Sequence, residues 1–262
     1  MRPARTILPT VLAVALAVGL SGMVQAASPS PAVDPTSSTR ASGESTTTGF
    51  ATPEDAVREY LAGVAAGDVS RILAASAVDE ASAGFAFPAF IDRLKAFPPT
   101  SLGPSDYPFY AEINRAELTE RILRRVQMLA YGLLSGEEID GGMIAPADRA
   151  WAEEFVGKVD PSRLAGLTIE DIRFSVPDLQ DDARFLDTMA KMAAVYGADE
   201  LTERLVLFSL DEQLYDLGFT VARYGDSWKV FDQVASLAGT DPLGTARPTT
   251  VEEYQQRTSA EG

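Results

Sequence analysis

The sequence predicts an α+β domain in which N-terminal helices and a helical middle pack on a curved antiparallel sheet built mainly from C-terminal strands. Apolar residues recur at helical spacing from about residue 52 to residue 165, whereas apolar and polar residues alternate along segments between residues 167 and 234. A Gly-Asp pair at residues 225–226 joins the last two segments and is typical of a tight hairpin. We therefore expect a single α+β domain over residues 51–237.

The N-terminus is typical of a Sec-type signal peptide spanning residues 1–26. Two arginines precede an apolar run over residues 7–20, and Val24 and Ala26 are the small residues that a signal peptidase reads. This run is shorter than the roughly 20 residues that a membrane-spanning helix needs. Cleavage near Ala26 is therefore expected to leave no membrane span.

The residues around the cleavage site also bear on localisation. Met23 occupies the position where lipid attachment would need a cysteine thiol, so a lipoprotein is not expected. Residues 27–50 are rich in Ser, Thr and Pro and lack apolar periodicity, which predicts a disordered tether. The sequence thus predicts a protein that is secreted or held at the extracellular face of the cell envelope.

Composition excludes several classes of function. The chain carries 38 Asp and Glu against 22 Lys and Arg, a net charge of −16 that repels a nucleic-acid backbone. It contains no Cys and no His, which removes Ser-His-Asp and Cys-His catalysis and the usual ligands of zinc, copper and haem. We expect no metal, no cofactor and no nucleic-acid partner.

The first elements are two short helices. Thr52 can cap a helix that Pro53 begins and Gly67 ends, and Asp68 can cap the next one. The apolar face of the first helix comprises Val57, Tyr60, Leu61 and Val64. This face is expected to pack on the sheet.

The middle of the chain, about residues 85–165, is predicted to be a large helical insertion. A short amphipathic stretch ends at two prolines, residues 98–99, which cannot continue a helix. A longer helix is expected over residues 110–134, followed by Gly136. Its apolar stripe comprises Leu118, Ile122, Val126, Leu129 and Leu133.

The strands follow after residue 165. Alternation along residues 167–176 slips by one position at Glu170 and Asp171, which indicates a β-bulge. A helix is expected over residues 181–196. Further strands are expected over residues 205–210, 215–224 and 228–234, forming an antiparallel meander. Residues 238–262 are expected to be a loosely ordered tail, with at most a short helix over residues 251–256.

Two segments together suggest a family. The opening helix, T-P-E-D-A-V-R-E-Y-L-A-G-V-A-A-G-D from Thr52 to Asp68, and the hairpin Y-G-D-S-W-K-V-F from Tyr224 to Phe231 resemble the nuclear-transport-factor-two-like superfamily, also called cystatin-like or SnoaL-like. The resemblance is to its exported actinobacterial members. It implies helices packed on a strongly curved sheet to form a cone with an apolar pocket. It covers the two ends of the domain and leaves the helical insertion outside the pattern.

The resemblance implies a binding or interaction module. The cone would hold a small apolar ligand, or the sheet face would meet an envelope protein or a second copy of the chain. Side chains that could line the pocket are Tyr60, Leu94, Phe174, Phe208, Phe219 and Trp228. For each of them, filling the core is the competing interpretation.

Two alternatives remain open. An isomerase or cyclase of this superfamily would use a buried carboxylate as base and a tyrosine as hydrogen-bond donor. The nearest candidates are Asp171 at the bulge with Tyr215 or Tyr224, although Asp171 is also an ordinary polar residue at a strand irregularity. The other alternative is an accessory or structural protein of the cell envelope. We expect binding without catalysis.

Overall fold

The structure is a computed structural model that describes residues 49–137, 139, 142–144 and 148–259. The chain divides into two units, Met1–Glu44 and Ser45–Gly262, and all of the described residues belong to the second. The expected signal peptide and its cleavage site lie outside the described residues, as does the expected tether up to residue 48. No helix within the described residues is both long and apolar enough to cross a membrane.

The first helix has both predicted ends, and the second begins after the predicted cap, Asp68. Helix α1 (Pro53–Ala66) is capped by Thr52, whose Oγ1 accepts a hydrogen bond from the Asp55 N–H at 3.1 Å. It ends at Gly67 in the left-handed conformation, with φ 63°. Helix α2 (Val69–Ala74) follows directly, so the two helices form a hairpin beside the sheet.

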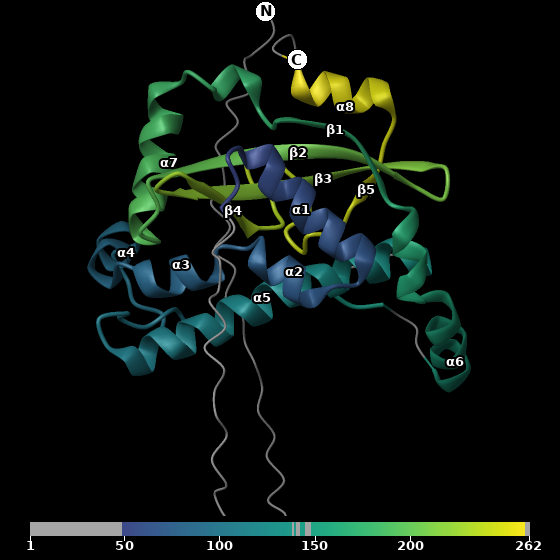
Figure 1. The fold of residues 1–262 in the computed structure, drawn as a ribbon, viewed down its shortest axis with the longest axis horizontal. Coiled ribbons are helices and arrows are strands. Elements are labelled where there is room, and N and C mark those ends of the chain that lie inside the picture. The colour runs from purple at the N-terminus through teal and green to yellow at the C-terminus, as the bar shows by residue number, and fades with distance from the viewer. Residues whose placement is uncertain (1–48, 138, 140–141, 145–147, 260–262) are drawn as a thin grey trace, which may run out of the picture. The chain divides into compact units, whose positions relative to one another are not determined.

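The middle of the chain is helical as predicted. It contains α3 (Val78–Gly84), α4 (Phe87–Leu94), the long α5 (Pro108–Ser135), α6 (Arg149–Lys158) and the 3₁₀ helix η1 (Pro161–Gly166). The predicted apolar stripe of α5 faces the core: Leu118, Ile122, Leu129 and Leu133 are buried and Val126 is half-buried. Figure 1 shows α5 running below α2 and α3.

The sheet is antiparallel, in the order β1-β2-β3-β4. The strands in this order are β1 (Thr168–Phe174), β2 (Glu200–Leu210), β3 (Gln213–Tyr224) and β4 (Ser227–Asp232), and a fifth strand pairs with β3 beside this path. The short 3₁₀ helix η2 (Pro177–Leu179) and helix α7 (Ala183–Val195) connect β1 to β2. The predicted bulge is present, because the β1–β2 register shifts between Ile169 and Asp171.

The sheet lies between two layers, with α1, α2 and α5 on one side and helix α8 (Val251–Thr258) on the other (Figure 1). On the α1 side, the rings of Tyr60 and Phe219 meet edge to face at 5.6 Å, and both side chains are fully buried. On the α8 side, Tyr254 packs on Leu205 and Leu207. Both faces of the sheet are therefore covered.

The C-terminal segment is more ordered than we expected. Residues Arg247–Pro248 form strand β5, which pairs with β3, and the short helix expected over residues 251–256 is present as α8, which extends to Thr258. Tyr254 is 1% exposed and its hydroxyl donates to the Leu205 carbonyl oxygen at 3.1 Å. One buried aromatic ring and its hydrogen bond thus fix a segment whose composition is polar.

The two hairpin turns differ in strain. Strands β2 and β3 are joined by Asp211 and Glu212, which have φ values of 49° and 66°. Positive φ at both positions is the pattern of a type I′ turn, which favours Asn-Gly. Strands β3 and β4 are joined by Gly225 and Asp226, and there glycine occupies the position with positive φ.

Replacing Glu212 with glycine is expected to raise the free energy of unfolding by about 1 kcal/mol, because glycine adopts positive φ without the Cβ penalty. Urea denaturation measures the change. The matched control is Asp226→Gly at the other hairpin, which should leave stability equal or lower since Asp226 has no positive φ to relieve. A loss of stability in Glu212→Gly would contradict the strain assigned to this turn.

Candidate functional site

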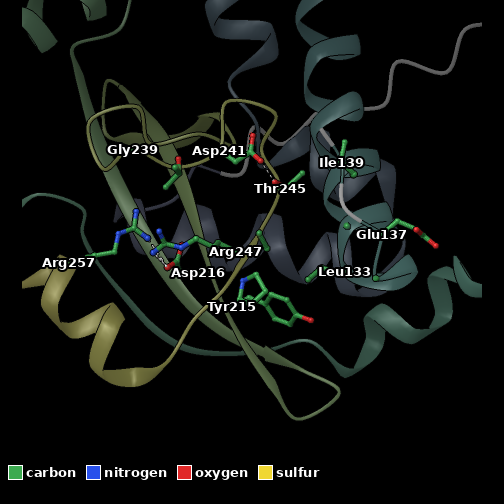
Figure 2. Close-up of a pocket in the computed structure, with 15 residues that line it drawn as sticks. Leu133, Glu137, Ile139, Tyr215, Asp216, Gly239, Asp241, Thr245, Arg247 and Arg257 are labelled. Carbon is green, nitrogen blue, oxygen red and sulfur yellow. Dashed lines mark hydrogen bonds and ion pairs between the residues drawn. The ribbon is translucent and has the colours of Figure 1, made fainter. Parts of the chain in front are cut away.

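A cavity of about 590 Å³ lies at the edge of the sheet. The end of α5, strands β3 and β5, the loop over residues 239–246 and one side chain of α8 surround it (Figure 2). Its apolar wall includes Leu133, Tyr215, Ala246 and Pro248. Charged side chains converge on the same cavity: Glu137, Asp216, Asp241, Arg247 and Arg257. This size and mixture are typical of a small-molecule site.

Strand pairing and small residues leave the space open. Strand β5 places Pro248 opposite Tyr215 and Arg247 opposite Asp216. On the facing helix, a Cβ atom added at Gly132 would lie 3.9 Å from the Thr245 Cβ, an ordinary contact distance. Because the glycine has no side chain, the space between the helix and the loop stays open at this position.

An ion cluster around a buried carboxylate closes one end of the cavity. The Asp216 side chain is 2% exposed, and its Oδ2 accepts from Arg247 Nη2 at 2.8 Å and from Arg257 Nη1 at 2.7 Å. Arg257 Nη2 also donates to the Ala238 carbonyl oxygen at 2.7 Å. One carboxylate thus holds two guanidinium groups, from β5 and from α8 (Figure 2).

Polar contacts from the core fix the loop that forms the rim. The Tyr60 hydroxyl donates to Gln233 Oε1 at 3.0 Å, and Gln233 Nε2 donates to the Gly244 carbonyl oxygen at 2.6 Å. Gly244 has φ 76° and lies against Gln233, so a side chain there would clash. The rim is therefore tied to the interior of the domain.

Glu203 holds the segment that leads into the same loop. Its side chain lies on β2 and is 3% exposed. One carboxylate oxygen accepts from the Leu237 N–H at 3.2 Å and the other from Ser175 Oγ at 3.1 Å. Burial raises the pKa of Glu203, and the hydrogen bonds from Leu237 and Ser175 oppose that shift.

The raised pKa of Glu203 predicts a pH dependence of stability. The folded state binds this proton more tightly than the unfolded state, so Glu203 lowers stability as pH rises from the ordinary value of 4.5 through the raised folded pKa. The stability gained by Glu203→Gln relative to wild type should therefore be larger at pH 7 than at pH 3. Urea denaturation at both pH values measures it. The exposed Glu112→Gln variant should show no such increase, and an equal gain for Glu203→Gln at both pH values would contradict the assignment.

The ion cluster predicts that a small change to the Asp216 side chain lowers the free energy of unfolding by a large amount. Asp216→Asn keeps the shape of the side chain but leaves the guanidinium groups of Arg247 and Arg257 without their anion, so we expect a loss of about 3 kcal/mol in unfolding free energy. The comparison is Asp187→Asn, which breaks an exposed ion pair with Lys191 and should cost at most about 0.5 kcal/mol. Chemical denaturation of both variants measures the contrast, and equal losses would show that the cluster does not hold the C-terminal segment.

Three of the six residues suggested as pocket-lining lie in the core. Tyr60, Phe208 and Phe219 are fully buried, packed between α1 and the sheet. The ring of Phe208 also stacks on Tyr215 at 5.6 Å, so it supports one wall of the cavity from behind. These side chains fill the space that the cone would otherwise enclose.

The other three lie apart from one another. Phe174 lines a second cavity of about 460 Å³ between α7 and β2, together with Phe185 and Met189. Leu94 is 46% exposed at the end of α4. Trp228 is half-buried beneath Arg223, whose guanidinium carbon lies 5.8 Å from the ring centre. The structure does not bring these three side chains into one pocket.

The suggested catalytic residues are also separated. Asp171 pairs in register with Leu207, on the α8 side of the sheet, whereas Tyr215 stacks on Phe208 on the other side. Asp171 is partly exposed and forms an ion pair with Arg173 at 2.6 Å. Tyr224 lies nine residues along β3 from Tyr215, about 30 Å at the rise of a strand, and its hydroxyl donates to the Tyr196 carbonyl oxygen.

The charged residues of the cavity were missed by sequence reasoning. Arg247 and Arg257 lie in the segment that we expected to be loosely ordered. The one available signal was Asp216, an acidic residue between apolar neighbours in a predicted strand. A buried carboxylate needs a cationic partner, but the sequence does not say which arginine supplies it.

The fold is similar to that of a cystatin-like protein from Ruminococcus gnavus ATCC 29149, with a TM-score of 0.54 and 20% sequence identity. The similarity covers 76% of this chain and 45% of that protein, so the chain spans less than half of its length. No family model matches the chain, and no curated protein matches its sequence. Similarity at this level of identity concerns the fold and not the activity. Together with the mixed helices and curved antiparallel sheet, it shows that the chain has a cystatin-like fold.

Proposed function

We propose that this domain is a secreted, non-catalytic binding module and that the cavity at the edge of the sheet holds a small ligand. The observation that carries the proposal is a cavity of about 590 Å³ with an apolar wall and converging charged groups. The charged groups have fixed partners, and the rim is tied to the core through Gln233. Such a cavity is formed before the ligand arrives, which reduces the entropy lost on binding.

Packing favours the edge of the sheet over the centre of the cone. Between α1 and the sheet, Tyr60 and Phe219 are in edge-to-face contact and are fully buried. A small apolar ligand placed there would have to displace core side chains, and protein cores tolerate little added volume. The ligand is therefore assigned to the cavity beside Tyr215.

The same geometry favours binding over isomerisation. A carboxylate acting as base needs to reach the substrate together with a hydrogen-bond donor. Asp171 and Tyr215 lie on opposite sides of the sheet, and Asp216 is occupied by two arginines. Neither Asp171 nor Asp216 is therefore arranged as the base of such a pair.

An accessory role at the cell envelope is the second candidate, and a specific surface favours it. Six large apolar side chains within residues 94–113 are more than 40% exposed: Leu94, Phe97, Tyr107, Phe109, Tyr110 and Ile113. Three of these rings lie together, since Tyr107 and Phe109 both meet Tyr110 edge to face. Exposed aromatic side chains of this kind are typical of protein contacts. The mass of the native protein distinguishes the two candidates, since a retained small molecule supports ligand binding, whereas the mass of the chain alone, as monomer or homodimer, supports a role in protein contacts.

Filling the cavity should abolish ligand binding. In Gly132→Leu the new side chain can extend into the cavity without backbone strain, because the Cβ position makes only ordinary contacts with Thr245. With 4-phenyl-1-butanol as the probe, we expect wild-type binding with amide shifts at Thr245 and Ala246 in NMR spectra. Gly132→Leu should weaken this binding by about tenfold or more.

The matched control is Gly157→Leu, which makes the same change on helix α6 where nothing lies within 4 Å of the added Cβ. It should bind the probe as wild type does. Failure of the wild-type protein to bind any of a set of small probes at this cavity would overturn the proposed function.

A further inference from the structure

We infer that the polar group recognised by this cavity is the carboxylate of a small organic acid, bound by the guanidinium group of Arg247. This inference rests on the proposed function, because it names the class of ligand for the same cavity. The chain has a net charge of −16, so a site for an anion is not what its composition suggests.

The first step is the balance of charge at one end of the cavity. Arg247 and Arg257 share the single carboxylate of Asp216, at 2.8 and 2.7 Å. Two positive charges against one negative charge leave an excess of one positive charge in this cluster. A monoanion placed beside the cluster would complete the neutralisation.

The second step concerns the hydrogen-bond donors that remain. A guanidinium group has five N–H donors. Among the residues that the structure describes, the only acceptor for the Arg247 side chain is Asp216, through Nη2. The Arg247 side chain is 54% exposed, whereas Asp216 is 2% exposed. Arg247 therefore keeps donors that a ligand can reach, in the planar arrangement that suits a carboxylate.

The third step concerns the two other acids that line the cavity. Glu137 forms an ion pair with Lys158 at 3.3 Å, and its carboxylate lies on the side opposite the two guanidinium groups in Figure 2. Asp241 accepts hydrogen bonds from its own turn, from the Leu243 N–H at 2.7 Å and from Thr245 Oγ1. Neither acid contacts Arg247 through an ion pair in the described part of the chain. The anion is thus assigned to the arginine end.

The fourth step is the body of the ligand. The apolar side chains that line the same cavity are Leu133, Tyr215, Ala246 and Pro248, and the Tyr215 ring is held by its stack on Phe208. These surfaces bury apolar area and offer a flat ring for an aromatic or alkyl group. The class of ligand is therefore a monocarboxylic acid with an apolar body.

Three probes of equal shape and different charge test the inference: 4-phenylbutyrate, 4-phenyl-1-butanol and 4-phenylbutylamine at pH 7. We expect the acid to bind about tenfold more tightly than the alcohol and the amine to bind most weakly. Arg247→Gln should weaken binding of the acid by about tenfold and binding of the alcohol much less, so that the preference for the acid is lost. Isothermal titration calorimetry gives the affinities, and NMR shifts at Ala246 place the probe.

The matched control is Arg58→Gln, which removes one positive charge from an exposed position on α1. It should leave all three affinities at the wild-type values. Arg247→Gln keeps the Asp216 ion pair with Arg257, so the variant is expected to fold, and circular dichroism checks this.

The outcomes separate the two proposals. Equal binding of acid and alcohol, with no effect of Arg247→Gln, would overturn the inference and leave the cavity as a site for neutral ligands. Preference for the acid that persists unchanged in Arg247→Gln would also overturn it, because the anion would then lie elsewhere. Absence of binding by all three probes at the cavity would overturn both the inference and the proposed function.

Discussion

The buried carboxylate of Asp216 is the constraint on which the C-terminal half of the domain depends. An unpaired charge in this position would cost several kcal/mol, so strand β3 is stable only when cations reach it. The two arginines that do so lie 31 and 41 residues further along the chain. Their contacts fix β5 and α8 against the sheet, and the same contacts place Arg247 at the cavity. The cavity is therefore a consequence of how the fold satisfies one buried charge.

The two faces of the sheet also contribute to the cavity in different ways. On the α1 face, two hydrogen bonds run from Tyr60 to Gln233 and from Gln233 to the Gly244 carbonyl oxygen. They set the position of the loop that forms the rim. On the α8 face, Tyr254 packs on leucines of β2 and holds the helix that carries Arg257. Because each wall is fixed by a different layer, the cavity does not depend on one flexible loop.

Periodicity was sufficient for most of the fold. Capping residues and apolar spacing predicted α1, α5 and α7, and the slip in alternation predicted the bulge in β1, because these features depend on local geometry. The site could not be predicted in the same way. Alternation indicates which face of a strand is buried, but it does not identify a partner 31 residues away, such as Arg247 for Asp216. Alternation also does not distinguish a side chain in the core from one that lines a pocket. That difference depends on how completely the opposite layer fills the space above the strand, and around Phe219 the space is filled.

The acidic composition and an anion site are compatible because the two act over different distances. At physiological ionic strength, charges more than about 8 Å apart in solvent are largely screened, so acids elsewhere on the surface contribute little at the cavity. A guanidinium group in direct contact acts at about 3 Å, where screening is weak and hydrogen bonds add to the attraction. A large polyanion would meet the repulsion of the whole surface, whereas a small acid would meet mainly Arg247 and its apolar surroundings. A net charge that repels a nucleic-acid backbone is thus compatible with a small carboxylate as the proposed ligand.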